Sequence, residues 1–167
     1  MAFSGFINIA DIKGESGDTD HADWIEFQSF EHHVLMPGGA GVSASGGLAG
    51  GKADCGDFKI TKLFDKATPH LCEYVFSAKE PATIEVQTCD TQAGKQFTFM
   101  KWTFEDCIIS GYRQFGNSSD DDFNRPQEEI TFRFARLKWE YTPRDDAGKA
   151  GAAEKGGWDR KTNALYT

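Results

Sequence analysis

The sequence predicts a mainly β protein, an antiparallel β-barrel with one flanking α-helix and a long, extended, glycine-rich loop. Two observations lead to this fold class. Apolar residues recur at every second position over most of the chain, which is the period of a β-strand. The 167 residues are 13% aromatic and include 14 Phe, which is enough apolar volume for one core. We therefore expect a single domain spanning residues 1–167.

The longest alternating segment, residues 128–141, changes its apolar parity in the middle. Ile130, Phe132 and Phe134 are apolar at even positions, whereas Leu137, Trp139 and Tyr141 are apolar at odd positions. The switch near Ala135 predicts a bulge or a strand that crosses from the core to an interface. Residues 97–104 are apolar on both parities, which predicts a strand covered on both sides. The other predicted strands are residues 6–9, 24–30, 58–61, 83–88 and 107–112.

One helix is expected to begin near Thr68, which can serve as its N-cap, with Pro69 in the first turn. Leu71, Tyr74 and Val75 then recur at the i, i+3, i+4 spacing of a buried helix face. The helix is therefore expected to lie against the barrel.

Two segments cannot be assigned to the core. Residues 37–56 are rich in glycine and carry almost no large side chains, and a loop of this length is often functional. The polar tail ends in Trp158 and Tyr166, which resemble anchors on another surface. We expect the loop at 37–56 and the tail at 145–167 to act as assembly arms.

Composition argues against several classes of protein. The net charge is −8, and no basic stripe is present, so nucleic acid is not an expected partner. No apolar run is long enough for a transmembrane helix, so membrane insertion is not expected. Residues 1–6 lack the basic and apolar regions of a secretory signal peptide.

Residues 46–52 match the G-x-x-x-x-G-K part of a phosphate-binding loop. The next residue is Ala53, so the hydroxyl that would bind magnesium is missing. The segment that follows has the pattern of a strand, and phosphate-binding loops lead into a helix N-terminus. Nucleotide binding is therefore not predicted.

Neither a metal site nor a catalytic site is indicated. Asp18, Asp20, His21 and Asp23 carry possible ligand atoms, but their spacing fits no calcium loop, so a solvated turn is expected. The four cysteines form no C-x-x-C pair and are expected to be free thiols in a reducing cytoplasm. No histidine has an evident Cys or Ser partner at a spacing that the sequence can support. We predict no enzyme activity and no cofactor.

Several ordered segments resemble the haemolysin co-regulated protein family, Hcp, the inner-tube subunit of type VI secretion systems. The resemblance covers nearly the whole chain, although residues 80–124 match only in strand pattern. The segments that carry it are I-A-D-I-K-G-E-S at 9–16 followed by His21, the glycine-rich 37–51, F-K-I-T-K at 58–62, D-K-A-T-P at 65–69, E-I-T-F-R-F-A at 129–135, Y-T-P at 141–143 and Gly157-Trp158.

This resemblance implies a β-barrel that assembles as a homohexameric ring, with rings stacked into a tube expelled from Gram-negative bacteria. The implied partners are other copies of the chain, effector proteins in the lumen, and spike and sheath components of the secretion system. The implied location is the cytoplasm and then the extracellular space, reached without a signal peptide.

On this basis we expect ring stacking and subunit contacts to use Pro37, Gly38, Gly39, Gly46, Gly47, Leu48, Gly50, Gly51, Lys52 and Trp158. Gln28 and Glu31 are the candidates for lining the lumen and contacting effectors. Two alternatives stay open: a monomeric β-barrel that carries an apolar ligand, and an enzyme built on a barrel.

Overall fold

The computed structural model describes residues 3–37, 52–92, 95–118, 125–145 and 147–167. The described chain contains one helix and is otherwise dominated by antiparallel strands, so the mainly β prediction is confirmed. The elements are β1 (Ser4–Ile9), β2 (Ile25–Phe27), β3 (Ser29–Glu31), β4 (Val34–Leu35), β5 (Asp54–Cys55), β6 (Phe58–Leu63), α1 (Thr68–Ser77), β7 (Thr83–Gln92), β8 (Lys95–Phe115), β9 (Gln127–Tyr141), β10 (Glu154–Asp159) and β11 (Ala164–Leu165).

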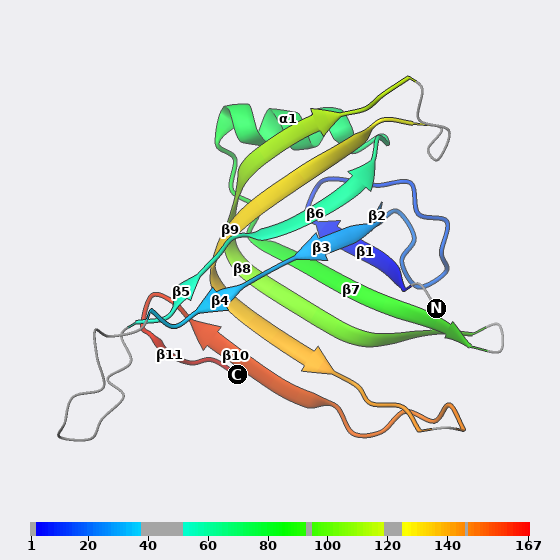
Figure 1. Cartoon of the computed structure of the whole chain (residues 1–167), viewed down its shortest axis with the longest axis vertical. Helices are drawn as coiled ribbons and strands as arrows, with labels where there is room; N and C mark the ends of the chain where they lie inside the picture. The colour runs from blue at the N-terminus through cyan, green and yellow to red at the C-terminus, as the bar shows by residue number, and fades with distance from the viewer. Residues whose placement is uncertain (1–2, 38–51, 93–94, 119–124, 146) are drawn as a thin grey trace.

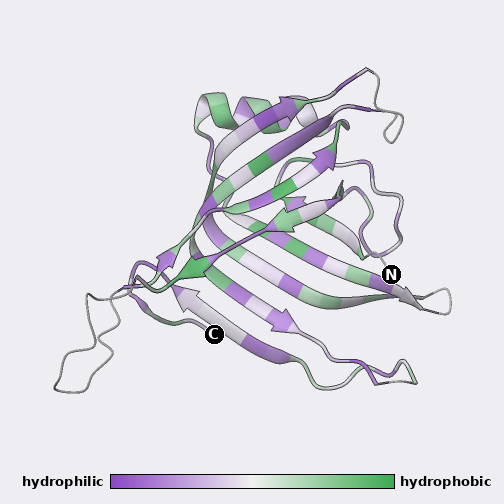
Figure 2. Ribbon diagram, viewed as in Figure 1, coloured by the Kyte–Doolittle hydropathy of each residue, from purple (hydrophilic) through white to green (hydrophobic). Residues whose placement is uncertain are grey.

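Nine strands form one sheet with the order β11-β10-β9-β8-β7-β1-β2. β6 joins this sheet by pairing with β9, and β3 pairs in turn with β6. The remaining two strands, β4 and β5, form a separate hairpin that projects to the left in Figure 1. Hydrophobic and hydrophilic residues alternate along the long strands, as Figure 2 shows, so one face of the sheet covers the core.

The predicted strand at 24–30 is divided in two at Gln28. β2 pairs with β1, whereas β3 pairs with β6 on the other side. The backbone N–H of Gln28 donates to the carbonyl of Thr61 at 2.8 Å, so the chain changes partner within one residue. The apolar parity changes at this exchange, because Ile25 and Phe27 are at odd positions whereas Phe30 is at an even one. The prediction of one strand did not take this change into account.

The separate strands predicted at 97–104 and 107–112 are one strand of 21 residues, β8. The two parts meet at Asp106, which has φ 53, a conformation that Asp tolerates better than most residues. The N–H groups of Asp106 and Cys107 donate to the carbonyls of Ala82 and Pro81 at 3.0 and 3.2 Å. These bonds keep β8 in the sheet through the irregularity.

The predicted change of apolar face near Ala135 is confirmed in β9. Phe132 and Phe134 are buried on one parity, and Leu137 is buried on the other. The first part of β9, up to Phe132, pairs with β6, whereas the part from Arg136 onward pairs with β10. A single strand therefore belongs to two neighbouring parts of the sheet.

The core is centred on three phenylalanines from three strands. The ring centroids of Phe58 lie 4.9 Å from Phe104 and 5.3 Å from Phe132, and those of Phe104 and Phe132 are 4.9 Å apart. All three side chains are fully buried. The isoleucines that surround them are Ile7, Ile9, Ile25, Ile60, Ile84 and Ile130.

The predicted helix is present, but its N-cap is Ala67 and not Thr68. Thr68 is the first residue of the helix, and its hydroxyl accepts from the N–H of Asp65 at 3.1 Å and donates to a carboxylate oxygen of Glu128 at 2.9 Å. Leu71 and Tyr74 are buried against the sheet, as the spacing predicted. Val75 packs beside them and is partly buried.

A buried ion pair joins the start of this helix to the sheet. Lys62 Nζ donates to Glu128 Oε1 at 2.6 Å, to Asp65 Oδ1 at 2.8 Å and to the carbonyl of Leu63 at 2.8 Å. The other oxygen of Glu128 accepts a hydrogen bond from the Tyr112 hydroxyl at 2.5 Å. Both Lys62 and Glu128 are completely buried, and their hydrogen-bonding groups are satisfied within this network.

The tail packs on the chain's own sheet. Trp158 lies opposite Leu137 of β9, and the hydroxyl of Tyr166 donates to Glu105 Oε2 at 2.9 Å. Gly157 is required for this packing, because a Cβ there would lie 1.9 Å from the carbonyl oxygen of Tyr166. The role of residues 145–167 in assembly stays a prediction.

Among the described residues, no helix is long and apolar enough to cross a membrane.

Candidate interaction surface

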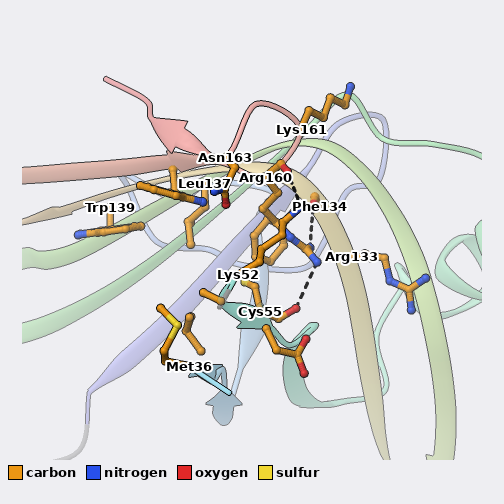
Figure 3. A pocket seen from close by; sticks show the side chains of 14 residues that line it. Met36, Lys52, Cys55, Arg133, Phe134, Leu137, Trp139, Arg160, Lys161 and Asn163 are labelled. Carbon is orange, nitrogen blue, oxygen red and sulfur yellow. Dashed lines mark hydrogen bonds between the residues drawn. The ribbon is translucent and has the colours of Figure 1, made fainter. Parts of the chain in front are cut away.

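A groove of about 920 Å³ separates the β4–β5 hairpin from strands β9 and β10 (Figure 3). Its residues come from four separate parts of the chain. They are Val34, Met36, Lys52, Ala53, Asp54, Cys55, Arg133, Phe134, Leu137, Trp139, Trp158, Arg160, Lys161 and Asn163. We call this hollow the β10 groove.

The face of the sheet that borders the β10 groove is aromatic and apolar. The β9–β10 register places Leu137 opposite Trp158 and Trp139 opposite Gly156, so these residues share one face. Gly156 leaves room for the Trp139 ring, because a Cβ there would lie 2.6 Å from its indole nitrogen. The Trp139 side chain remains 38% exposed.

The hairpin on the opposite side carries an exposed apolar run, Val34-Leu35-Met36. Their exposed fractions are 56%, 57% and 60%. Large apolar side chains that stay in water at consecutive positions are unusual in a soluble monomer and indicate an interaction site.

Arg160 connects the hairpin to the sheet. Its guanidinium donates to the carbonyl of Phe134 in β9 at 2.8 Å and to that of Cys55 in β5 at 3.3 Å (Figure 3). It also lies 5.3 Å from the centre of the Phe134 ring. Lys52 Nζ is 3.5 Å from the carbonyl of Arg160. Among the described residues, neither cation forms an ion pair with a carboxylate.

Arg133, at the edge of the β10 groove, is held by Asp57. Its Nε and Nη2 donate to the two carboxylate oxygens of Asp57 at 3.1 and 3.3 Å, and Ser110 Oγ donates to Oδ2 at 2.6 Å. Burial alone would raise the pKa of Asp57, but the Ser110 hydroxyl and the Arg133 guanidinium outweigh it and lower the pKa. Asp57 therefore stays ionised in the folded chain below its ordinary pKa.

We expect Asp57→Asn to weaken the loss of stability in acid. Because the pKa of Asp57 is lower in the folded chain, its contribution is complete above the unfolded pKa, about 3.9. That contribution is lost as the pH falls through the folded pKa. Urea unfolding between pH 5 and pH 2.5 should show a shallower pH dependence for Asp57→Asn than for the wild-type chain. Equal slopes would contradict the lowered pKa.

Two of the described residues that were predicted for subunit contacts lie at one site. Lys52 and Trp158 both line the β10 groove. Pro37 is exposed beyond the hairpin. The predicted contacts at Gly38, Gly39, Gly46, Gly47, Leu48, Gly50 and Gly51 lie outside the described residues.

The two candidates for the lumen lie elsewhere and are both exposed. Gln28 accepts a hydrogen bond from Gln127 Nε2 at 2.8 Å. Glu31 pairs with Lys59 at 2.9 Å, and that lysine lowers the pKa of the carboxyl. Their place in a lumen stays a prediction.

Sequence reasoning missed the rest of the β10 groove. Arg160 and Trp139 were not singled out as site residues, because their partners in the groove are distant in the chain. A usable signal did exist: Val34, Leu35 and Met36 interrupt the alternating pattern immediately before Pro37. Three consecutive apolar residues beside a proline indicate an exposed edge more than a core strand.

The solvated turn predicted around His21 is wrong for the histidine. His21 is 3% exposed and stacks on Phe6 with 4.1 Å between ring centroids. Its Nδ1 lies 2.6 Å from Asp18 Oδ1, and its Nε2 lies 3.0 Å from Gln87 Oε1. The side chain therefore attaches the loop to the sheet, while Asp20 remains exposed.

One Cys–His pair lies at the β10 groove. Cys55 Sγ is 3.6 Å from His32 Nε2, a contact that the sequence did not reveal. Burial lowers the pKa of His32 and raises the pKa of the Cys55 thiol. Both groups are therefore neutral near pH 7, whereas a nucleophilic cysteine requires the thiolate.

The four described cysteines, Cys55, Cys72, Cys89 and Cys107, are free. The described part of the chain contains no group of three His, Cys, Asp or Glu that could hold a metal.

These features define the class: an antiparallel β-sheet protein that presents an apolar hairpin and an aromatic groove on its surface. The chain belongs to the family described as "Type VI secretion system effector, Hcp", which matches residues 6–141. Membership of this family places it among the tube proteins of type VI secretion.

Related proteins agree with this assignment. The chain is 29% identical over 164 residues to "Protein hcp1" of Pseudomonas aeruginosa, covering 98% of each chain. It is 27% identical over 133 residues to the "Major exported protein" of the same organism, covering 77% of this chain and 75% of that protein. A solved "type six secretion system protein" is 33% identical with a TM-score of 0.91, covering 99% of this chain and 100% of that one. Hcp1 from Salmonella typhimurium is 26% identical with a TM-score of 0.79 and the same coverage.

Proposed function

We propose that this protein forms homohexameric rings that stack into the inner tube of a type VI secretion system and carry effector proteins in the lumen. Its role is structural, and binding is non-covalent. The observation that carries the proposal is the exposed apolar run Val34-Leu35-Met36 beside the β10 groove. Gln28 and Glu31 remain the candidates for effector contact, and spike and sheath components are the further partners.

The energetics of the hairpin favour association. Complete burial of one Val, Leu or Met side chain is worth roughly 1.5–3 kcal/mol. Val34, Leu35 and Met36 are each more than half exposed, so a large part of this free energy is not gained within the single chain. Contact with another copy would gain it.

Closure of the sheet into a barrel belongs to the same proposal. β2 is paired with β1, and β3 is paired with β6, while both strands lie in one continuous segment. The hydrogen bond from the Gln28 N–H to Thr61 lies at the junction between them. Closure at this junction would leave no unpaired edge there, and the rigid wall would suit a stacked ring.

The location also follows as a proposal. A similar protein is named for its export. We infer that the chain is made in the cytoplasm and leaves the cell through the secretion system.

Light scattering behind a sizing column, with negative-stain images of the peak, tests the assembly. Six chains of 18.5 kDa have a mass of about 111 kDa, and open-centred rings are expected. A monomer at every concentration would refute the proposal and favour the ligand-carrying barrel.

Replacing Val34, Leu35 and Met36 together with Ser should move the peak toward smaller species. The matched control is Phe76→Ser on α1, because this side chain is 87% exposed and far from the hairpin in sequence. Equal behaviour of the two variants would remove the hairpin from the proposed interface.

A further inference from the structure

Charge is distributed unevenly along this acidic chain. Residues 11–26 contain six carboxylates and one lysine. Residues 133–161 contain eight Arg or Lys and five Asp or Glu, so this part is basic in a chain whose net charge is −8. Opposite charge on separate surfaces of one subunit allows like subunits to attract one another.

Residues 11–26 comprise most of the loop after β1 and the first two residues of β2, and we call them the acidic loop. Half of their carboxylates form no ion pair with another described residue. Glu15, Asp18 and Asp23 are already paired with Arg125, His21 and Lys13. The carboxylates without an ion pair among the described residues are Asp11, Asp20 and Glu26, and all three are exposed.

The β10 groove, in contrast, contains cations that have no carboxylate partner among the described residues. Arg160 is half-buried beside the Phe134 ring, and its described hydrogen bonds all go to carbonyl oxygens. Lys52 lies next to it. Among the described residues that line the groove, Asp54 is the one with a carboxylate. A cation in a partly desolvated, apolar hollow attracts a carboxylate more strongly than one in open water.

The two surfaces lie at opposite ends of the molecule. In Figure 1 the β4–β5 hairpin beside the β10 groove projects to the left, whereas the loop between β1 and β2 lies to the right, near the N-terminus. The acidic loop therefore cannot fill the groove of its own chain. A contact between unlike surfaces of two copies can repeat from copy to copy and close into a ring or continue as a filament.

We infer that the β10 groove of one copy binds the acidic loop of a second copy, with Arg160 and Lys52 facing the carboxylates of Asp20 and Glu26. This inference rests on the proposed self-association and specifies the surfaces that meet. The contact is heterologous, so every subunit supplies one groove and one loop. An acidic segment of an effector could use the same chemistry, and the test separates the two partners.

Charge reversal tests the pairing. Lys52→Glu should raise the concentration for half-assembly about tenfold or more, because it places like charges in contact. Arg160→Glu should have at least that effect, but Arg160 also holds β5 to β9, so Lys52→Glu is the variant that keeps the fold. Adding Asp20→Lys and Glu26→Lys to Lys52→Glu should restore most of the assembly. Analytical ultracentrifugation over a range of concentrations measures all of them, with circular dichroism as the check of folding.

Lys155→Glu is the matched control. This substitution changes the charge by the same amount as Lys52→Glu. Lys155 lies on β10 but does not line the β10 groove, and its side chain is 70% exposed. It should leave the concentration for half-assembly within about twofold of wild type, as expected for a surface pair.

The outcomes separate this inference from the proposed function. A wild-type chain that never assembles refutes the proposed function itself. A wild-type ring that Lys52→Glu does not weaken overturns the groove as the contact. Weakening by Lys52→Glu without rescue by the two lysines overturns the acidic loop as its partner. Rescue in the purified chain, with no effector present, is the result that supports a second copy.

Discussion

Lys62→Met should lower the free energy of unfolding by about 3–5 kcal/mol. The substitution removes the cation and leaves Glu128 in the core beneath the helix, with neither side chain exposed to solvent. An unpaired buried carboxylate must either stay charged in a low-dielectric site or take up a proton, and both cost free energy. Asp65 also loses its 2.8 Å contact with the lysine, so the turn before α1 is weakened.

Urea unfolding followed by tryptophan fluorescence at one fixed protein concentration measures the loss. The control is Lys59→Met, on the opposite face of the same strand, where the lysine pairs with Glu31 and is 34% exposed. Exposed pairs contribute about 0–1 kcal/mol, so the control should change little. Adding Glu128→Leu to Lys62→Met should recover part of the loss; equal effects at positions 62 and 59 would refute the account.

Phe58→Ala should destabilise the fold by about 3–5 kcal/mol through the cavity that it leaves. The ring is fully buried and contacts Phe104 and Phe132 from two other strands. Rigid strands cannot collapse fully into the space, so these neighbours lose dispersion contacts.

Phe76→Ala provides the comparison for the same chemical change. Phe76 is 87% exposed on α1, and its truncation should alter the unfolding free energy by no more than about 0.5 kcal/mol. Thermal unfolding followed by circular dichroism, with both variants at the same concentration, checks the difference. Similar losses in the two variants would show that the three-ring cluster does not form the core.

The strands were predictable where one face is uniformly apolar. Residues 6–9, 58–61 and 83–88 all lie within observed strands, and in the last two burial follows the period of two. The partner exchange at Gln28 was missed although the apolar parity changes there, from Ile25 and Phe27 on one face to Phe30 on the other. The prediction also divided β8 into two strands, whereas the structure has a local irregularity at Asp106 within one strand.

The buried ion pair was missed although the sequence contains a signal for it. Lys62 has the same parity as Phe58 and Ile60, and Glu128 has the same parity as Ile130 and Phe132. Opposite charges at the core positions of two strands indicate a buried pair. The pairing of β6 with β9 is what brings them together, and that pairing depends on the three-dimensional fold.

The β10 groove was only partly predictable. Trp158 was recognised as an anchor and Lys52 as part of the loop, but their proximity results from the register of β9, β10 and the hairpin. The groove is lined by residues from four segments that are distant in the chain, and no local sequence pattern predicts that they lie close together.

The position of β9 has a consequence for synthesis of the chain on the ribosome. β9 begins at Gln127, yet it pairs with β6, which ends at Leu63, and with β8 and β10. Until β9 has emerged, β6 lacks its neighbour on one side and β8 has an open edge of many residues, which is prone to aggregation. Folding must therefore wait for the last quarter of the chain, and pairing at such sequence separation is slow, in the millisecond to second range. Subunits that later assemble into a tube must therefore be kept from aggregating through their open strand edges during synthesis.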